Sequence, residues 1–157
     1  SVVPLLEGIE EVSLIGRDSD ALGLGPPTVA YGIVPSLESF YADAAVVVCP
    51  VIAGSGTSIK VIEAMAHGRA VVTTTVGARG LQLTHGEHAI ITDDPAEFAA
   101  AVNRLAHAPQ EAAALAARGR ALVAERYAPE VGASAPKIMR RRMLSTKPCR
   151  AARSSPC

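Results

Sequence analysis

A glycine-rich segment near the middle of the chain carries the residues best suited to chemistry. Gly54 and Gly56 allow backbone N–H groups to approach a ligand closely. The residues after them have helical spacing, and the N-terminus of a helix favours an anion. Lys60 falls in the first turn of that helix, and Glu63 lies three residues further on, so both share one face. A cation beside a phosphate and a carboxylate near ribose hydroxyls would suit a nucleotide diphosphate.

A simpler interpretation of the same residues stays open. The glycines could serve only to turn the chain, and Lys60 and Glu63 could form a solvated pair of the common, weak kind. The position of Lys60 favours the ligand-binding interpretation, because a cation in the first turn of a helix opposes the helix dipole unless an anion is bound there. The segment is neither a dinucleotide fingerprint nor a P-loop, since Ile59 stands where a third glycine would be and no Gly-Lys-Ser/Thr is present.

Apolar, β-branched runs on both sides of this segment predict strands at 45–49 and 70–75, the first of them buried on both faces. Between them, Thr57 and Ser58 are good N-cap residues, and Gly68 is a C-terminal stop. The apolar stripe predicted for this helix is Ile59, Ile62 and Ala66. A strand, a glycine loop, a helix and a second strand form the crossover unit of a parallel sheet.

The rest of the chain repeats this alternation. Further strands are predicted at 12–15, 29–31 and 89–92, and helices after Ser36, after Asp94 and over 110–126. The predicted buried stripes are Leu37, Phe40, Tyr41 and Ala44, then Phe98, Val102 and Leu105, then Leu115 and Leu122, with Gly119 permitting close packing. The fold class is α/β, a Rossmann-like parallel sheet flanked by helices. Ligands of such sheets bind outside the carboxyl ends of the strands, where loops 50–58, 76–81 and 16–20 should gather.

Residues 54–81 also carry a family resemblance. They read Gly54-Ser-Gly-Thr-Ser-Ile-Lys60-Val-Ile-Glu63-Ala-Met-Ala-His-Gly68-Arg-Ala-Val-Val72, then Val76-Gly-Ala-Arg-Gly-Leu81. This resembles the donor-site segment of GT-B glycosyltransferases of group 1 (family 4), and the resemblance runs from about residue 11 to about residue 130. Supporting motifs are Val12-Ser-Leu-Ile-Gly16, Val34-Pro-Ser-Leu37, Tyr41-Ala-Asp-Ala44 and His85-Gly-Glu-His-Ala89.

The resemblance implies a C-terminal, nucleotide-sugar-binding domain in which the glycine loop and helix start bind the diphosphate and sugar, and Glu63 binds the ribose. Arg79 either meets a phosphate or faces solvent. The sequence departs from many members at Ser55, where they have a first Glu. The implied donor-binding residues are Gly54, Ser55, Gly56, Thr57, Ser58, Lys60, Glu63 and Arg79.

The implied reaction transfers a sugar from a nucleotide diphosphate sugar, usually with retention of configuration. Two parts of the GT-B fold are absent here: the acceptor-binding N-terminal domain, and the first strand of the C-terminal domain with its phosphate-binding loop. The isolated chain is therefore expected to be incomplete for turnover, and its catalytic residues are unknown. Two alternatives are a nucleotide-binding fragment without catalysis and a sugar-nucleotide epimerase of the same fold. The sequence does not give the donor sugar, the base or the acceptor.

Charge divides the chain into an acidic body and a basic tail. Of the 15 basic residues, seven follow Glu130, where no acid occurs, so the body holds 15 acidic against eight basic residues. Apolar periodicity is also lost there, which predicts a folded domain over 1–130 and a disordered tail over 131–157. A nucleic-acid or acidic-lipid contact through Arg140–Arg142 is one use of such a tail.

Neither a metal nor a disulfide is expected. The one D-x-D sequence, Asp18-Ser19-Asp20, is read as a turn, and GT-B enzymes do not need that motif. His85 and His88 lack a third ligand, and Cys49 is read as a small core residue. Three cysteines without paired spacing give no disulfide framework, and no membrane span or leader is evident, so a reducing cytoplasm is the expected compartment.

Overall fold

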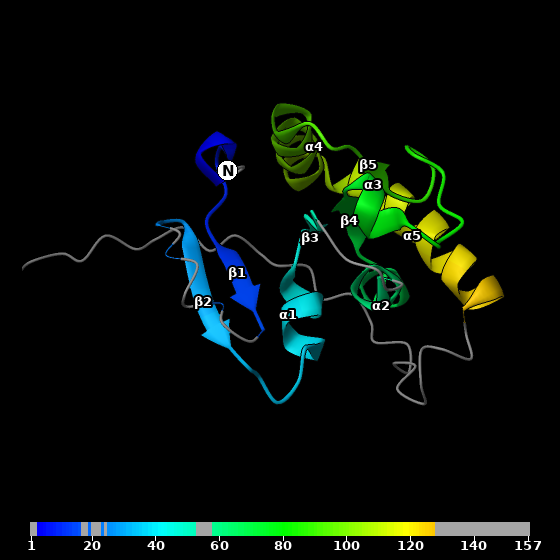
Figure 1. The fold of residues 1–157 in the computed structure, drawn as a ribbon, viewed down its shortest axis with the longest axis horizontal. Helices are drawn as coiled ribbons and strands as arrows, with labels where there is room; N and C mark the ends of the chain where they lie inside the picture. Colours follow the sequence, from blue (N-terminus) through cyan, green and yellow to red (C-terminus); the bar gives the residue numbers. More distant parts are fainter. Residues whose placement is uncertain (1–2, 17–18, 20–22, 24, 53–57, 128–157) are drawn as a thin grey trace, which may run out of the picture.

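Among the residues that the structure describes, five parallel strands form two separate sheets (Figure 1). The computed structural model describes residues 3–16, 19, 23, 25–52 and 58–127. One sheet pairs β1 with β2, and the other has the order β3-β4-β5. The strands are β1 Val12–Ile15, β2 Thr28–Gly32, β3 Val46–Cys49, β4 Ala70–Thr73 and β5 Ile90–Ile91.

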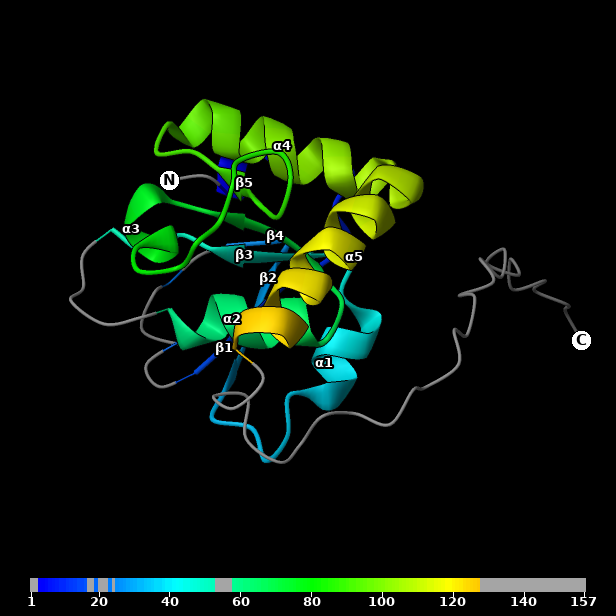
Figure 2. The same ribbon diagram turned by 90° about the vertical axis from the view of Figure 1, so that its right-hand side faces the viewer.

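Helices cover both faces of the three-stranded sheet, as Figure 2 shows for α2 below it and α4 above it. The helices are α1 Glu38–Asp43, α2 Ile59–Ala66, α3 Thr75–Ala78, α4 Pro95–His107 and α5 Pro109–Arg126, after a 3-10 turn η1 Val3–Leu5. The predicted α/β fold with parallel sheets flanked by helices is confirmed. One expectation differs, because the strands do not form one continuous sheet.

Alternating residues of β3 and β4 face two different cores. Val46, Val48 and Val72 pack with α4 and the first half of α5. Val47 and Val71 pack with α2 and the far end of α5 on the other face. Alternation of this kind is the period of a strand, and cover on both faces is what a parallel sheet requires.

The ends of α2 and α4 follow from local sequence. Gly68, at φ 68°, closes α2 with two backbone hydrogen bonds, from Gly68 N to Met65 O at 2.9 Å and from Arg69 N to Ala64 O at 3.0 Å. This is the Schellman motif that favours glycine. At the start of α4, the Asp94 carboxylate accepts hydrogen bonds from the Ala96 and Glu97 amides, which confirms the predicted cap.

The predicted burial is wrong at two helices. Ile59 is 71% exposed, and the buried residues of α2 are instead Val61, Ile62, Ala64 and Met65. The reason is that α2 packs on both β4 and α5, so its buried face is wider than one stripe and is turned away from Ile59. In α1 no residue is buried, although Tyr41 packs at the margin of the core.

Two strand predictions are also corrected. The strand predicted over 70–75 ends at Thr73, because the Thr74 hydroxyl accepts a hydrogen bond from Gly77 N and starts α3. The strand predicted at 45–49 is not buried on both faces, since only Cys49 is buried and residues 46–48 are half-buried. This partial exposure agrees with the position of β3 at the edge of its sheet. β3 pairs with β4 on one side and has no partner strand on its other side among the described residues.

Some predictions lie outside the described residues. These include the domain boundary at residue 130 and the basic tail over 131–157. Within residues 3–16, 19, 23, 25–52 and 58–127, no helix has both the length and the apolar character needed to span a membrane.

A glycine in the middle of α5 provides a test of the packing. A Cβ on Gly119 would lie 2.9 Å from the His88 carbonyl oxygen and 3.3 Å from Met65 Cγ, which confirms that Gly119 permits close packing. Gly119→Ala should therefore destabilise the protein by about 1–3 kcal/mol, despite alanine's higher helix propensity, because the backbone oxygen must move. Ala117→Gly on the exposed face should cost about 1 kcal/mol by the ordinary propensity effect. Urea denaturation measures both, and a stabilised Gly119→Ala variant would contradict this packing.

Candidate functional site

The segments that follow β3 and β4 are held together at the carboxyl edge of the sheet. The Thr73 hydroxyl donates a hydrogen bond to the Cys49 carbonyl oxygen at 3.0 Å. The Thr74 hydroxyl donates to the Val51 carbonyl oxygen at 2.5 Å. Because both strands are parallel and end in register, Cys49 opposite Thr73, these bonds fix the start of one loop against the start of the next.

The third strand contributes to the same edge through α3. Asp93, two residues after β5, accepts a hydrogen bond from the Thr75 amide at 2.8 Å. Bonding to the Thr75 hydroxyl and amide lowers the pKa of the exposed Asp93 carboxyl from its ordinary value. At Gly77 the backbone comes so close to the edge that an added Cβ would overlap the Thr73 hydroxyl and lie 3.2 Å from the Cys49 carbonyl oxygen. The loops after β3, β4 and β5 therefore meet at one place.

The N-terminus of α2 opens at this edge. The Ser58 carbonyl accepts hydrogen bonds from the Val61 and Ile62 amides, but the Ser58 side chain caps nothing within the described residues. The Lys60 side chain is exposed in the first turn. Its positive charge acts on the Cys49 thiol at the end of β3, so the ammonium group lies within electrostatic reach of the strand end. The edge thus offers a helix N-terminus and the Lys60 cation to an anion.

Glu63 is half-buried on α2 and lies near an aromatic pair. The Tyr41 ring stacks on the His67 imidazole, with 4.4 Å between ring centroids and 17° between their planes. Burial and the nearby Glu63 carboxylate raise the pKa of Tyr41 well above its usual range, so the phenol stays protonated beside that carboxylate.

The structure places only part of the predicted donor-binding set. Ser58, Lys60 and Glu63 lie together on the first two turns of α2, and Arg79 is exposed at the end of α3. The remaining members lie outside the described residues, and they are Gly54, Ser55, Gly56 and Thr57. Asp18 and Asp20 also lie outside them.

Two residues of the site have no chemical role in the sequence analysis. Tyr41 appears there only in an apolar stripe and in a family motif, and Asp93 is not singled out there. The signal for Tyr41 is its ring, which is polar at one end and therefore seeks a partner when half-buried. The signal in the sequence for Asp93 is weaker: this residue follows a parallel strand at the edge where the loops gather.

The loop histidines serve the backbone. His85 Nδ1 accepts a hydrogen bond from Ile91 N at 3.1 Å, and His88 Nδ1 accepts one from Thr84 N at 3.1 Å. In the part of the chain that the structure describes, no three His, Cys, Asp or Glu side chains are grouped so that they could hold a metal ion.

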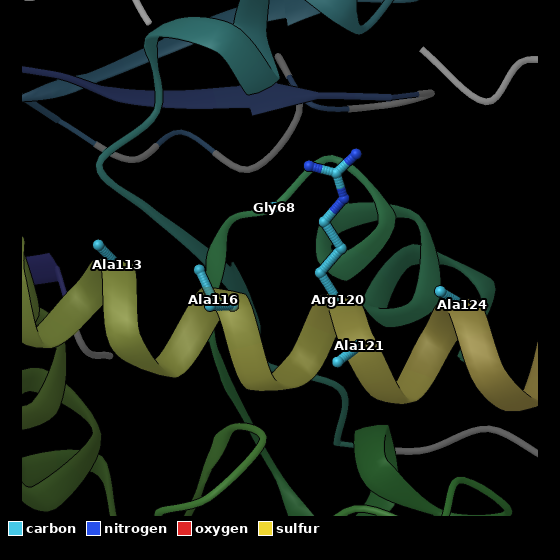
Figure 3. Close-up of a pocket in the computed structure, with 7 residues that line it drawn as sticks. Gly68, Ala113, Ala116, Arg120, Ala121 and Ala124 are labelled. Atoms are coloured by element: carbon cyan, nitrogen blue, oxygen red, sulfur yellow. The ribbon is translucent and has the colours of Figure 1, made fainter. Parts of the chain in front are cut away.

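A hollow elsewhere on the surface takes no part in this site. Figure 3 shows it between α5 and Gly68. Its volume is about 550 Å³. Gly68 precedes β4, so the hollow lies toward the amino ends of the strands, opposite the edge just described. Arg120 is the one charged residue among its lining residues, and most of the others are alanines.

Comparison with known proteins identifies the family to which the chain belongs. Residues 7–108 match the family described as glycosyl transferases group 1. A stretch of 63 residues is 32% identical to an uncharacterized 44.6 kDa protein in the cps region of Klebsiella pneumoniae, and it covers 40% of this chain and 16% of that protein. These findings confirm the resemblance that residues 54–81 carry.

Solved structures agree with the fold. Anabaena HepE in complex with UDP-glucose has a TM-score of 0.69 at 18% identity, over 80% of this chain and 39% of HepE. HepE in complex with UDP and glucose has a TM-score of 0.63 at 21% identity, over 73% of this chain and 36% of HepE. The C-terminal domain of the Francisella tularensis group 1 protein LpcC has a TM-score of 0.58 at 23% identity, over 70% of this chain and 58% of that domain. The chain thus spans less than two thirds of each relative.

The Cys49 thiol makes stability depend on pH at this edge. Burial raises the pKa of Cys49 to about 11, and the Lys60 charge only partly opposes that effect. The unfolded thiol loses its proton first, so its contribution to stability is complete below about pH 9 and is lost as pH rises toward 11. The wild type should lose on the order of 2–3 kcal/mol more than Cys49→Ala between pH 8 and 11. Denaturation under reducing conditions measures this, and parallel pH profiles would contradict it.

Proposed function

Because the chain belongs to the glycosyl transferases group 1 family, we propose that it holds the nucleotide diphosphate sugar donor of a glycosyl transfer reaction. The donor lies at the carboxyl edge of the β3-β4-β5 sheet, with its diphosphate on the N-terminus of α2. One observation carries this proposal: the uncapped start of α2 and the exposed Lys60 converge at the edge where three loops meet. Backbone N–H groups and a fixed cation are the groups that bind a diphosphate.

Support for a nucleotide sugar comes from the relatives. The Anabaena structures hold UDP-glucose in one case and UDP with glucose in the other. In our proposal Glu63 accepts hydrogen bonds from the ribose hydroxyls, and Arg79 and Ser58 face the phosphates or the sugar. The proposed set is completed by the loop residues Gly54, Ser55, Gly56 and Thr57.

The proposed reaction passes the sugar from the nucleotide diphosphate to an acceptor with retention of configuration, as in the enzymes that the sequence resembles. The chain's part is to bind the donor and to stabilise the negative charge that develops on the leaving diphosphate. Lys60 and the α2 N-terminus suit that task, since they are in place before the reaction starts. The acceptor side of the cleft would come from the N-terminal domain of a longer protein, which fits the chain's coverage of only 39% of HepE.

Substitution of Lys60 and Glu63 separates the two halves of the donor. Lys60→Ala should weaken binding of UDP by about 1.5–3 kcal/mol, the range for hydrogen bonds to charged groups. Glu63→Gln should weaken UDP binding but leave inorganic pyrophosphate unaffected, because pyrophosphate has no ribose. Titration calorimetry with both ligands measures these effects.

Arg120→Ala is the matched control for that experiment. It removes an exposed cation at the opposite edge of the sheet and should leave the affinity for both ligands unchanged. Equal UDP affinity in the wild type, Lys60→Ala and Glu63→Gln would show that these residues of α2 do not bind the donor.

Donor binding is proposed to need no divalent metal. A metal-dependent site bridges the diphosphate with a cation held by carboxylates, whereas Lys60 and the helix N-terminus can neutralise the diphosphate directly. EDTA should leave UDP affinity unchanged, and so should the double substitution Asp18→Asn and Asp20→Asn. A tenfold loss on chelation that Mg²⁺ or Mn²⁺ restores would show that a metal takes part.

A further inference from the structure

A second hollow lies at the outer edge of the three-stranded sheet, between β5 and α4. β5 is the last strand in the order β3-β4-β5, so its far side has no partner strand among the described residues. Figure 2 shows α4 passing above β5. The hollow has a volume of about 320 Å³, which is near the lower limit of about 300 Å³ for sites that bind small molecules. A ligand of one ring would fit that volume.

The floor of this hollow is apolar and continuous with the core. Ile90 of β5 and Ala101 of α4 line it, and both are buried in the cluster beneath α4. Ala100, the neighbouring residue on α4, also lines the hollow but is exposed. The two alanines leave space that a longer side chain would fill. The side chains of the floor therefore offer van der Waals contact to the C–H groups of a ligand, and no hydrogen bond.

Polar side chains lie at the two ends of the floor. Glu97 and Arg104 both line the hollow from α4. They are seven residues apart, so the helical rise of 1.5 Å per residue separates their Cα atoms by about 10 Å along the helix. Seven residues are almost two turns, which keeps both side chains on one face. A single ring can therefore lie on the alanines with one polar group at each end.

Each of these two charged side chains is anchored within the protein and keeps a polar atom for a ligand. The Thr92 hydroxyl donates to Glu97 Oε2 at 2.8 Å, and Glu97 Oε1 has no partner in the described part of the chain. Arg104 Nε pairs with Glu111 Oε1 at 3.1 Å, and the two terminal nitrogens of Arg104 have no partner there either. One end of the hollow thus offers an acceptor, and the other end offers donors.

His85 adds a third anchored polar group, which lines the hollow from the loop before β5. Its Nδ1 lies 3.1 Å from the Ile91 amide nitrogen and 2.8 Å from the Ile91 carbonyl oxygen. This ring nitrogen therefore bonds to the backbone of β5 in either tautomer of the imidazole. The other ring nitrogen, Nε2, has no partner among the described residues and is left for a ligand.

The charges around the hollow favour an uncharged ligand over an ion. Glu111 balances the charge of Arg104, and Glu97 lies in the first turn of α4, where the helix N-terminus favours a carboxylate. The protein itself therefore compensates both charges. Hydroxyl groups can donate to the Glu97 carboxylate and accept from Arg104 without adding charge. A pyranose carries hydroxyls around its ring and C–H groups on its faces, so its chemistry matches both the ends and the floor of the hollow.

We propose that this hollow binds one pyranose unit of a carbohydrate, at a site separate from that of the proposed donor. The bond from Thr92 to Glu97 places one end of the hollow just beyond the carboxyl end of β5, next to Asp93 and the edge where the three loops meet. A carbohydrate bound here is held beside that edge, on the outer side of the sheet. The binding depends on the hollow alone, and it holds whether or not the edge binds a nucleotide.

A titration of the full chain followed by methyl NMR tests this site, with glucose, galactose and mannose as probes. At least one of these sugars should shift the methyl signals of Ile90 and Ala101 until they saturate, with a dissociation constant on the order of 1–10 mM, because a single ring makes few contacts. Ala100→Leu fills the hollow and should weaken that binding by about tenfold or more. The matched control is Ala96→Leu, an exposed position on the same helix outside the hollow, which should keep the wild-type affinity.

A second variant tests the polar contacts without changing the shape of the hollow. Glu97→Gln should weaken sugar binding by about threefold or more, because a hydrogen bond to a carboxylate is stronger than one to an amide. Methyl signals that do not saturate with any of the three sugars would overturn the proposal, as would equal affinity in the wild type and Ala100→Leu. Saturable shifts of the same methyl signals with glycine or inorganic phosphate, but with none of the sugars, would overturn it as well, because the hollow would then select a charged ligand.

Discussion

The candidate site depends on one buried hydroxyl. Thr73 is fully buried at the end of β4, and its hydroxyl donates to the Cys49 carbonyl oxygen. A buried polar group without a partner costs about 1–3 kcal/mol, so this bond is strongly favoured once β4 is enclosed. It joins the ends of β3 and β4, and Gly77 then fits against the same two residues because it has no side chain. The positions of the loops after these strands follow from that contact.

The enclosure of β4 is what makes the contact obligatory. Val71 and Val72 are fully buried on opposite faces, one against α2 and the other against α4. Burial of a valine side chain is worth roughly 1.5–3 kcal/mol, so the two helices are held to the sheet from both sides. The N-terminus of α2 is positioned by this packing and not by a capping side chain among the described residues. A helix end without its own cap leaves N–H groups available to a ligand.

The packing of the N-terminal third contrasts with that of the rest. Between Pro4 and Val48, no apolar side chain of the described residues is buried, and α1 contributes only half-buried residues. The Asn103 hydrogen bonds to Leu5 and Glu7 nevertheless hold the chain start on α4. The described part of this segment is therefore anchored to α4 but poorly covered.

The sequence by itself determined the alternation of elements, the parallel fold and the family. β-branched runs, the Asp94 cap and the Gly68 stop depend on neighbours within a few residues, so local physics is enough to place them. Only the tertiary structure decided which side chains of α2 are buried, because that depends on α5 as well as on β4. It also decided that the strands form two sheets and that Tyr41 and His67 stack beside Glu63. Those contacts join residues far apart in the chain, and no local pattern records them.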